Sequence, residues 1–190
     1  MRTTVKPLSS RLNSWTLGGV LLAAAAALAP MQAQASGVSA AAYLQCRNAP
    51  VTNFPGTIVD AAIATPELST LVNLVVAADL VGPLSGKGPL TVFAPTNEAF
   101  GKVPPALLSL IGSDTSLLTS VLTYHVTPGT VDPRRSLLPH QVKTLQGQSV
   151  FVGFDADGAS VNQSVAACKG VKTTNGTVWI INSVLLPQFK

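Results

Sequence analysis

The sequence is poor in the side chains that carry out catalysis. Only 11% of its 190 residues are charged, and it contains 8 acidic side chains and 2 histidines. None of the G-x-S-x-G, H-E-x-x-H, P-loop or G-x-G-x-x-G motifs is present. The carboxylates are scattered, and no two lie in a helical register that would bring them to one site. We therefore expect that the protein is not an enzyme.

Ligands for metal ions are equally scarce. The cysteines, Cys46 and Cys168, and the histidines, His125 and His140, have spacings unlike those of zinc sites. The segment 155–158, DADG, lacks the further acids and the downstream glutamate of a calcium-binding loop. Turn chemistry accounts for each of its residues, so we predict a turn there. The sequence thus predicts no metal and no cofactor.

The N-terminal residues have the order typical of a secretory signal peptide. Basic side chains at positions 2, 6 and 11 precede the apolar run 15–29, and Ala33-Gln34-Ala35 supplies small residues for cleavage. We predict cleavage after Ala35, which makes residues 1–35 the signal peptide and the mature protein secreted or periplasmic. The alternative is an uncleaved membrane anchor, although about fifteen apolar residues are short for a span. We expect no membrane span after the signal is removed.

Removal of the signal leaves little net charge. All 8 acidic side chains but only nine of the 12 basic ones follow residue 35, so the formal net charge falls from +4 to +1. Arg134-Arg135 is the only adjacent basic pair, and Asp132 is close to it in the sequence. Without a basic patch, we expect no nucleic-acid partner.

Both cysteines belong to the mature part of the chain. Export to an oxidising compartment makes a disulfide between Cys46 and Cys168 the first expectation, with two free thiols or a metal pair as the rivals. Residues 36–56 are small and polar and contain two prolines, so we predict an N-terminal arm that Cys46 attaches to the domain formed by residues 57–190.

The first half of the mature chain has helical patterns. A short helix is expected over Thr57–Ala64, and Thr65-Pro66-Glu67 has the cap, proline and acid of a helix start. That second helix is predicted to continue to about Leu80, with an apolar stripe over 68–76. Two more are predicted, a short one from Pro105 that Gly112 stops, and one over Thr115–Tyr124 that Ser113 or Asp114 caps.

The stretch Leu90–Phe100, LTVFAPTNEAF, predicts a buried strand that turns directly into a helix. Its first half is apolar and β-branched, and Pro95 closes it. Thr96 occupies the N-cap position of the following helix, and Glu98 lies in the first turn, where an acid complements the helix dipole. Such a corner fixes the angle between a sheet and its helices.

The second half of the chain has strand patterns. Short apolar strands are expected around 150–154 and 159–162, and the segments 171–174 and 177–185 flank Asn175-Gly176. Asn-Gly between two strands predicts a two-residue type I′ hairpin turn. Helices followed by strands indicate an α+β fold with a mostly antiparallel sheet.

Three motifs in this order resemble the fasciclin (FAS1) domain family: TVFAPTNEAF at 91–100, the Tyr124-His125 pair within LTYHVTPG, and NGTVWIINSVLLP at 175–187. The resemblance covers residues 57–187 and implies a wedge of a twisted sheet with several short helices packed on it. Two positions depart from the family pattern. Trp179 stands where the family usually has histidine, and Asn182 where it usually has aspartate.

The resemblance implies an extracytoplasmic adhesion or surface interaction module that binds a protein or a glycan. In animal members the tyrosine–histidine region is implicated in receptor contacts, which makes Tyr124 and His125 the candidate binding residues. From the sequence alone, His125 is more simply interpreted as a core histidine that bonds to the backbone. Some fasciclin-type proteins hold carotenoids, so an apolar-ligand carrier is the alternative, with the apolar faces of 68–76 and 117–122 as candidate walls.

Overall fold

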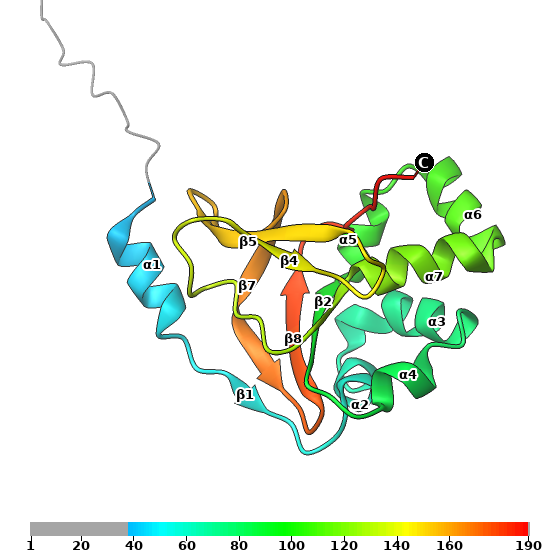
Figure 1. The fold of residues 1–190 in the computed structure, drawn as a ribbon, viewed down its shortest axis with the longest axis horizontal. Coiled ribbons are helices and arrows are strands. Elements are labelled where there is room, and N and C mark those ends of the chain that lie inside the picture. The colour runs from blue at the N-terminus through cyan, green and yellow to red at the C-terminus, as the bar shows by residue number, and fades with distance from the viewer. Residues whose placement is uncertain (1–37, 190) are drawn as a thin grey trace, which may run out of the picture. The chain divides into compact units, whose positions relative to one another are not determined.

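The computed structural model describes residues 38–189 (Figure 1). The predicted signal peptide, residues 1–35, lies outside the described residues, so its cleavage stays a prediction. The described strands are β1 (Thr52–Asn53), β2 (Leu90–Pro95), β3 (Val126–Pro128), β4 (His140–Lys143), β5 (Ser149–Asp155), β6 (Gly158–Val161), β7 (Ser164–Lys172) and β8 (Gly176–Ile181).

These strands form one sheet of eight with the order β3-β2-β8-β7-β6-β5-β4, and β1 pairs with β7 beside this path. The pairs β2–β8 and β1–β7 are parallel, and the other pairs are antiparallel. The pairing of β7 is irregular between Ala166 and Gly170, where the strand passes from one half of the sheet to the other. Beyond β4, the Leu145 N–H donates to the Val126 carbonyl oxygen (2.8 Å), which brings the chain back to β3. The sheet therefore curves almost into a barrel.

Short helices pack against both faces of this sheet. They are α1 (Ala40–Arg47), α2 (Ile58–Ile63), a 3-10 turn (Pro66–Leu68), α3 (Ser69–Ala77), α4 (Val81–Ser85), α5 (Asn97–Gly101), α6 (Pro105–Ser113) and α7 (Thr115–Tyr124). In Figure 1, α3, α4, α6 and α7 lie together on one side of β2 and β8, and α1 lies on the opposite side. This arrangement confirms the predicted α+β class.

The sheet separates two hydrophobic cores, and strand β2 contributes to both. Val92 and Ala94 pack among the helices, whereas Phe93 points into the curve of the sheet, where it joins Trp179 and Ile181. Because both faces of β2 are buried, its sequence does not alternate between apolar and polar residues, and Thr91 is its one polar side chain. The predicted buried strand at 90–95 is thus the central wall between the two cores.

The corner after β2 has the predicted cap. The Thr96 side-chain oxygen accepts a hydrogen bond from the Ala99 N–H (3.1 Å), and Glu98 lies in the first turn of α5. The Asn97 side chain forms hydrogen bonds with the segment 66–70. Its oxygen accepts from the Thr70 N–H (2.9 Å), and its amide donates to the Pro66 carbonyl oxygen (3.1 Å). The corner therefore also positions the start of α3.

The predicted type I′ turn at Asn175-Gly176 is wrong. The non-glycine residues with positive φ in the described part of the chain are Asp79 and Asn162, and Gly176 is not among the positive-φ glycines. The turn instead spans Thr173–Gly176, where the Thr173 N–H donates to the Gly176 carbonyl oxygen (2.8 Å). A Cβ on Gly176 would lie 2.0 Å from the Leu90 carbonyl oxygen. Close approach of the backbones of β2 and β8, rather than turn geometry, requires glycine here.

Asn175 has a different role from the one predicted. Its side-chain oxygen accepts from the Ile58 N–H (2.9 Å), and its amide donates to the carbonyl oxygens of Leu84 (2.8 Å) and Gly86 (3.0 Å). One side chain thus joins the start of α2, the end of α4 and the β7–β8 turn. These bonds cross 117, 91 and 89 residues of sequence, so no local pattern reveals them.

Two helix boundaries also differ from the predictions. Thr65 does not cap the next helix, because its hydroxyl donates back to the Ala61 carbonyl oxygen (2.8 Å) at the end of α2. Gly112 does not stop α6, which continues to Ser113. Asp114 is the cap of α7, accepting from Ser116 N–H (2.8 Å) and Leu117 N–H (3.1 Å).

The described part of the predicted N-terminal arm, residues 38–56, contains a helix and a short strand. Ser39 caps α1, whose Tyr43 and Cys46 are buried against the inner face of the sheet, with the Tyr43 ring edge-on to Phe154 at 5.0 Å. After α1, strand β1 adds to β7 in parallel. This segment therefore forms part of the second core, because it covers apolar side chains that the strongly curved sheet leaves open.

Candidate functional site

Tyr124 and His125 lie at the end of α7, and both side chains are buried. Tyr124 is 5% exposed. Its hydroxyl donates to the Ser149 carbonyl oxygen (3.2 Å) and accepts from the Asn162 side-chain amide (3.2 Å). Helix α7 is thereby joined to β5 and to the turn after β6. The structure places Tyr124 in the core, and its predicted part in partner binding stays a prediction.

His125 is more deeply buried, at 2% exposure, and both ring nitrogens have backbone partners. Nδ1 lies 2.8 Å from the Val121 carbonyl oxygen, and Nε2 lies 2.9 Å from the Leu185 N–H. An acceptor at one nitrogen and a donor at the other define the neutral tautomer with its proton on Nδ1. Burial lowers the pKa of His125 to about 4, against a smaller upward effect of the Val121 bond. The ring is therefore a neutral connector between α7 and the C-terminal segment.

The two neighbours border different cavities. His125 contributes to the wall of an apolar cleft under α2 and α3, and Tyr124 lies at the border of a larger polar hollow beside β5 and β6. The resemblance pointed to this pair as one binding surface. In the structure the two side chains border different cavities, one with apolar walls and one with mixed walls, and the role of the pair in partner binding stays a prediction.

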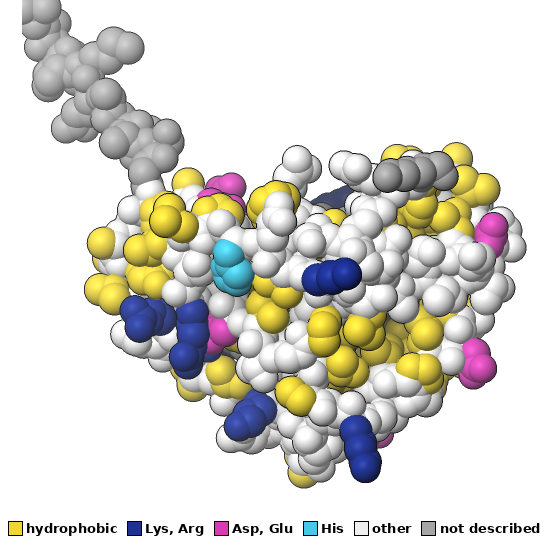
Figure 2. All heavy atoms as spheres, in the orientation of Figure 1, with side chains coloured by type: hydrophobic (Ala, Val, Ile, Leu, Met, Phe, Trp, Pro, Cys, Tyr) yellow, Lys and Arg dark blue, Asp and Glu magenta, His cyan; other side chains and the backbone are white. Residues whose placement is uncertain are grey.

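The apolar cleft lies between the helices and the sheet and has a volume of about 150 Å³. Its walls come from one face each of α2, α3 and α4, with β2, β3 and β8 beneath, and among the residues that the structure describes His125 is the only polar side chain in these walls. The side chains of Ile63 (63% exposed) and Val76 (60% exposed) lie at its edge. Figure 2 shows hydrophobic side chains gathered at the lower right, over the region where Figure 1 places α3 and α4. The stripe predicted over 68–76 thus contributes both to the core and to this cleft.

The polar hollow has a volume of about 1290 Å³ and lies between the β5–β6 strands and the segment 183–188. Within residues 38–189, its walls mix amide and hydroxyl side chains with apolar ones such as Phe151 and Leu186, and Asp155 is the one acidic side chain. Two amides are fixed in place. The Gln148 side chain makes two hydrogen bonds with the backbone of Gln188 (2.8 and 2.9 Å), and Asn162, at a φ of 54°, bonds to both backbone groups of Phe151. The sequence carried no signal for this hollow, because its walls come from separate segments.

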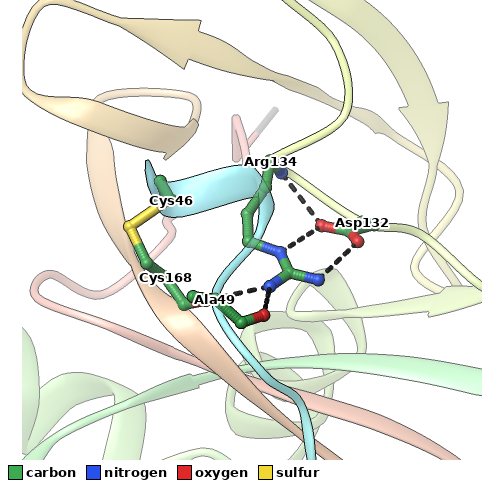
Figure 3. Close-up of a disulfide and its surroundings, with 5 residues drawn as sticks. All are labelled: Cys46, Ala49, Asp132, Arg134 and Cys168. Carbon is green, nitrogen blue, oxygen red and sulfur yellow. Dashed lines mark hydrogen bonds and ion pairs between the residues drawn. A yellow bond between two sulfur atoms is a disulfide. The ribbon is translucent and has the colours of Figure 1, made fainter. Parts of the chain in front are cut away.

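A third group of residues joins the N-terminal segment to the sheet (Figure 3). Cys46 of α1 and Cys168 of β7 form a disulfide with an S–S distance of 1.99 Å. The buried Arg134 guanidinium donates to the carbonyl oxygens of Ala49 (2.7 Å) and Cys168 (3.1 Å) and makes a two-point ion pair with Asp132. The same segment is thus held once covalently and once by hydrogen bonds.

The ion pair of Asp132 and Arg134 is a structural unit that was not predicted from the sequence. Burial raises the pKa of Asp132, but the hydrogen bonds and charge of Arg134, with a smaller contribution from Arg135, outweigh it and hold the pKa below its usual value. The local signal is an aspartate two residues before an arginine that also belongs to a basic pair. Only the fold shows that Arg134 is buried and Arg135 is exposed.

The two positions that depart from the family pattern are both structural. Trp179 is buried, its Nε1–H donates to the Val131 carbonyl oxygen (2.9 Å), and the Arg134 guanidinium lies 4.7 Å from its ring centre. A Cβ on Gly170 would lie 2.8 Å from this ring, so glycine opposite Trp179 makes room for it. The Asn182 side-chain oxygen accepts from the Val165 N–H (2.9 Å), an acceptor role that an aspartate could also fill.

Residues 38–189 contain no group of three or more His, Cys, Asp or Glu side chains able to hold a metal ion. Among these same residues no single helix is long and apolar enough to cross a membrane. Helices α6 and α7, taken together, pass the test by length and composition alone, but a bend of 109° separates them.

Comparison with known proteins agrees with the motifs. The fasciclin domain model matches residues 66–187. Cell surface glycolipoprotein MPB83 of Mycobacterium bovis is 42% identical over 135 residues, covering 68% of this chain and 60% of that protein. Immunogenic protein MPB70 of the same species is 42% identical over 132 residues, 67% of each chain. Protein sll1483 of Synechocystis is 37% identical over 133 residues, 69% of this chain and 73% of that protein.

The chain therefore spans about three fifths of the length of MPB83 and two thirds of that of MPB70. The family model covers more than half of the chain and includes the strand β2, the Tyr124-His125 pair and the strand β8. Together with relatives of about 40% identity, this match shows that the chain belongs to the fasciclin domain family.

Proposed function

We propose that the protein is a secreted, non-enzymatic adhesion or interaction module that binds a protein or a glycan at the cell surface or in the envelope. The observation that carries this proposal is the polar hollow of about 1290 Å³, whose walls combine amides and hydroxyls with apolar side chains, a mixture that suits recognition. Membership of the fasciclin family and the similarity to MPB83, a cell surface glycolipoprotein, support an extracytoplasmic site of action.

The scaffold around the hollow suits this role. The disulfide, the Arg134 hydrogen bonds and the neutral His125 connector join segments that are distant in the sequence. A preorganised surface loses less conformational entropy when it binds, so more of the contact energy appears as affinity.

The experiment is a binding assay on envelope preparations from the producing cells. Labelled mature protein is expected to bind saturably and to be displaced by an excess of unlabelled protein, whereas reduced and alkylated protein does not compete. Treatment of the envelope with protease or with periodate distinguishes a protein partner from a glycan. Absence of saturable binding to every envelope fraction would overturn the proposal.

The apolar cleft supports a second candidate function, the binding of an apolar ligand. A volume of about 150 Å³ accommodates a group the size of one small ring, so a carotenoid-type ligand would insert one end and leave the rest across α2 and α3. Solvent extraction of the purified protein, followed by absorbance, tests for such a ligand.

Two substitutions make this test specific. Ala62→Phe fills the cleft from α2, and Ala77→Phe adds the same ring to the exposed face of α3, outside the cleft. Loss of the ligand from Ala62→Phe alone supports the second function. A colourless extract, or equal loss from both variants, contradicts it.

A further inference from the structure

The polar hollow has a chemistry that selects against charged ligands. In the described part of the chain, no lysine, arginine or histidine contributes to its walls, and Asp155 is the one carboxylate. An anionic ligand would find no cation to neutralise it. A cationic ligand would find a single carboxylate at an exposed position. The hollow therefore favours a ligand without net charge.

Several polar groups in the hollow are free to bond to a ligand. The side chains of Ser149, Gln163 and Gln188 are exposed, and within residues 38–189 they make no hydrogen bond to the protein. A glutamine amide offers both donors and an acceptor, and a serine hydroxyl is both at once. A ligand rich in hydroxyl groups, each of them a donor and an acceptor, complements such a set.

An exposed aromatic ring, that of Phe151, completes the hollow. Val150 and Val152 of β5 point into the core, whereas Phe151 between them points outward and is 50% exposed. A single exposed phenylalanine is not unusual, because much of any protein surface is apolar. Its place in the wall of a polar hollow, with the Asn162 side chain fixing its backbone N–H (2.8 Å), gives it a defined position beside the free amides.

We propose that the polar hollow is a binding site for a neutral saccharide. The Phe151 ring packs against the C–H face of one sugar ring, and Gln163, Ser149 and Gln188 bond to its hydroxyl groups. A sugar ring has an apolar face and a hydroxylated edge, and this combination matches an aromatic ring surrounded by amides. A protein partner would instead be anchored by side chains inserted into dry apolar pockets, which the mixed walls of this hollow do not provide. This inference rests on the proposed function as an interaction module and names its ligand class.

The test is the binding of neutral oligosaccharides to the purified mature protein. The probes are hexaoses of glucose, mannose and galactose together with the neutral polysaccharide fraction released from the envelope, and polygalacturonate serves as the charged comparison. Titration calorimetry is expected to detect at least one neutral probe and no polygalacturonate. Binding of no neutral probe, or of polygalacturonate alone, would overturn the proposal.

The variants Phe151→Ala and Gln163→Ala assign the site. Both positions are exposed, so the melting temperature should stay unchanged while the affinity falls at least tenfold in each. Leu44→Ala and Gln45→Ala are the matched controls, because these exposed residues of α1 are of similar chemistry and lie outside the hollow. Equal affinity in wild type and in the double variant Phe151→Ala/Gln163→Ala would show that the saccharide binds elsewhere.

The envelope assay separates this proposal from the function on which it rests. If the double variant still binds the envelope like wild type, the saccharide site is wrong and the interaction function stands. If wild type itself shows no saturable envelope binding, the function has failed. Envelope binding that protease abolishes and periodate leaves intact would replace the saccharide with a protein partner.

Discussion

The Tyr124 hydroxyl accepts a hydrogen bond from the Asn162 side-chain amide (3.2 Å), and this contact joins the end of α7 to the turn after β6. Asn162 in turn fixes the backbone of Phe151. Tyr124, which belongs to a family motif, thus stabilises the wall of the polar hollow through the side chain of Asn162. Its effect on binding is expected to come through this support.

Tyr124→Phe should distinguish the contribution of the hydroxyl to stability from that of the ring. The variant retains the buried ring and loses two hydrogen bonds, so the free energy of unfolding should fall by about 1–2 kcal/mol. Tyr124→Ala should lose about 3–5 kcal/mol through cavity formation. Denaturant unfolding and envelope binding are measured on the same samples. A Tyr124→Ala protein that unfolds and binds like wild type would remove both the core role and the predicted binding role.

The burial of His125 should make stability depend on pH. Its pKa is about 4 in the folded protein, against 6.5 as the ordinary value. The unfolded chain therefore takes up the proton first as the pH falls. The stabilisation is complete above about pH 6.5 and is lost progressively toward pH 4, for a total of about 3 kcal/mol.

Denaturant unfolding across this pH range, with matched variants, assigns the effect. His125→Gln should flatten the dependence, and His140→Gln, at an exposed position, should leave it unchanged. The same slope in wild type and in His125→Gln would contradict the assignment.

The disulfide should contribute strongly to stability. It joins residues 122 positions apart, and the chain-entropy relation gives about 4–5 kcal/mol as the upper figure for a loop of this length. Mass spectrometry of the exported protein under non-reducing conditions should find no free thiol. The double variant Cys46→Ser/Cys168→Ser should lower the free energy of unfolding by up to this amount. Two cysteines that alkylate without reduction would show that the bond does not form in the exported protein.

Asn175 should be important for its side chain and not for its backbone. Asn175→Ala removes hydrogen bonds to Ile58, Leu84 and Gly86 and should destabilise the fold by about 2–3 kcal/mol. Asn175→Gly is the deciding comparison. A type I′ turn would accept glycine without loss, whereas the observed hydrogen bonds require that glycine be at least as harmful as alanine. A stable glycine variant would restore the turn interpretation.

Local chemistry explains which features were predictable. The Thr96 cap, the Asp114 cap and the apolar strand at 90–95 depend on residues within about four positions of one another, and all three are present. The prediction that Thr65 caps a helix was wrong for a related reason. Its hydroxyl had a competing acceptor one turn earlier, at Ala61, and a local pattern does not show which partner is chosen.

By itself the sequence determined the α+β class, the corner after β2 and, through its motifs, the family. Only the tertiary structure decided that Asn175 joins three segments, that Arg134 is buried against Asp132 and Trp179, and that Tyr124 and His125 border two different cavities. These contacts link residues up to 117 positions apart. Their geometry depends on how the sheet curves and where the helices pack, and neither is encoded in the spacing of neighbouring residues.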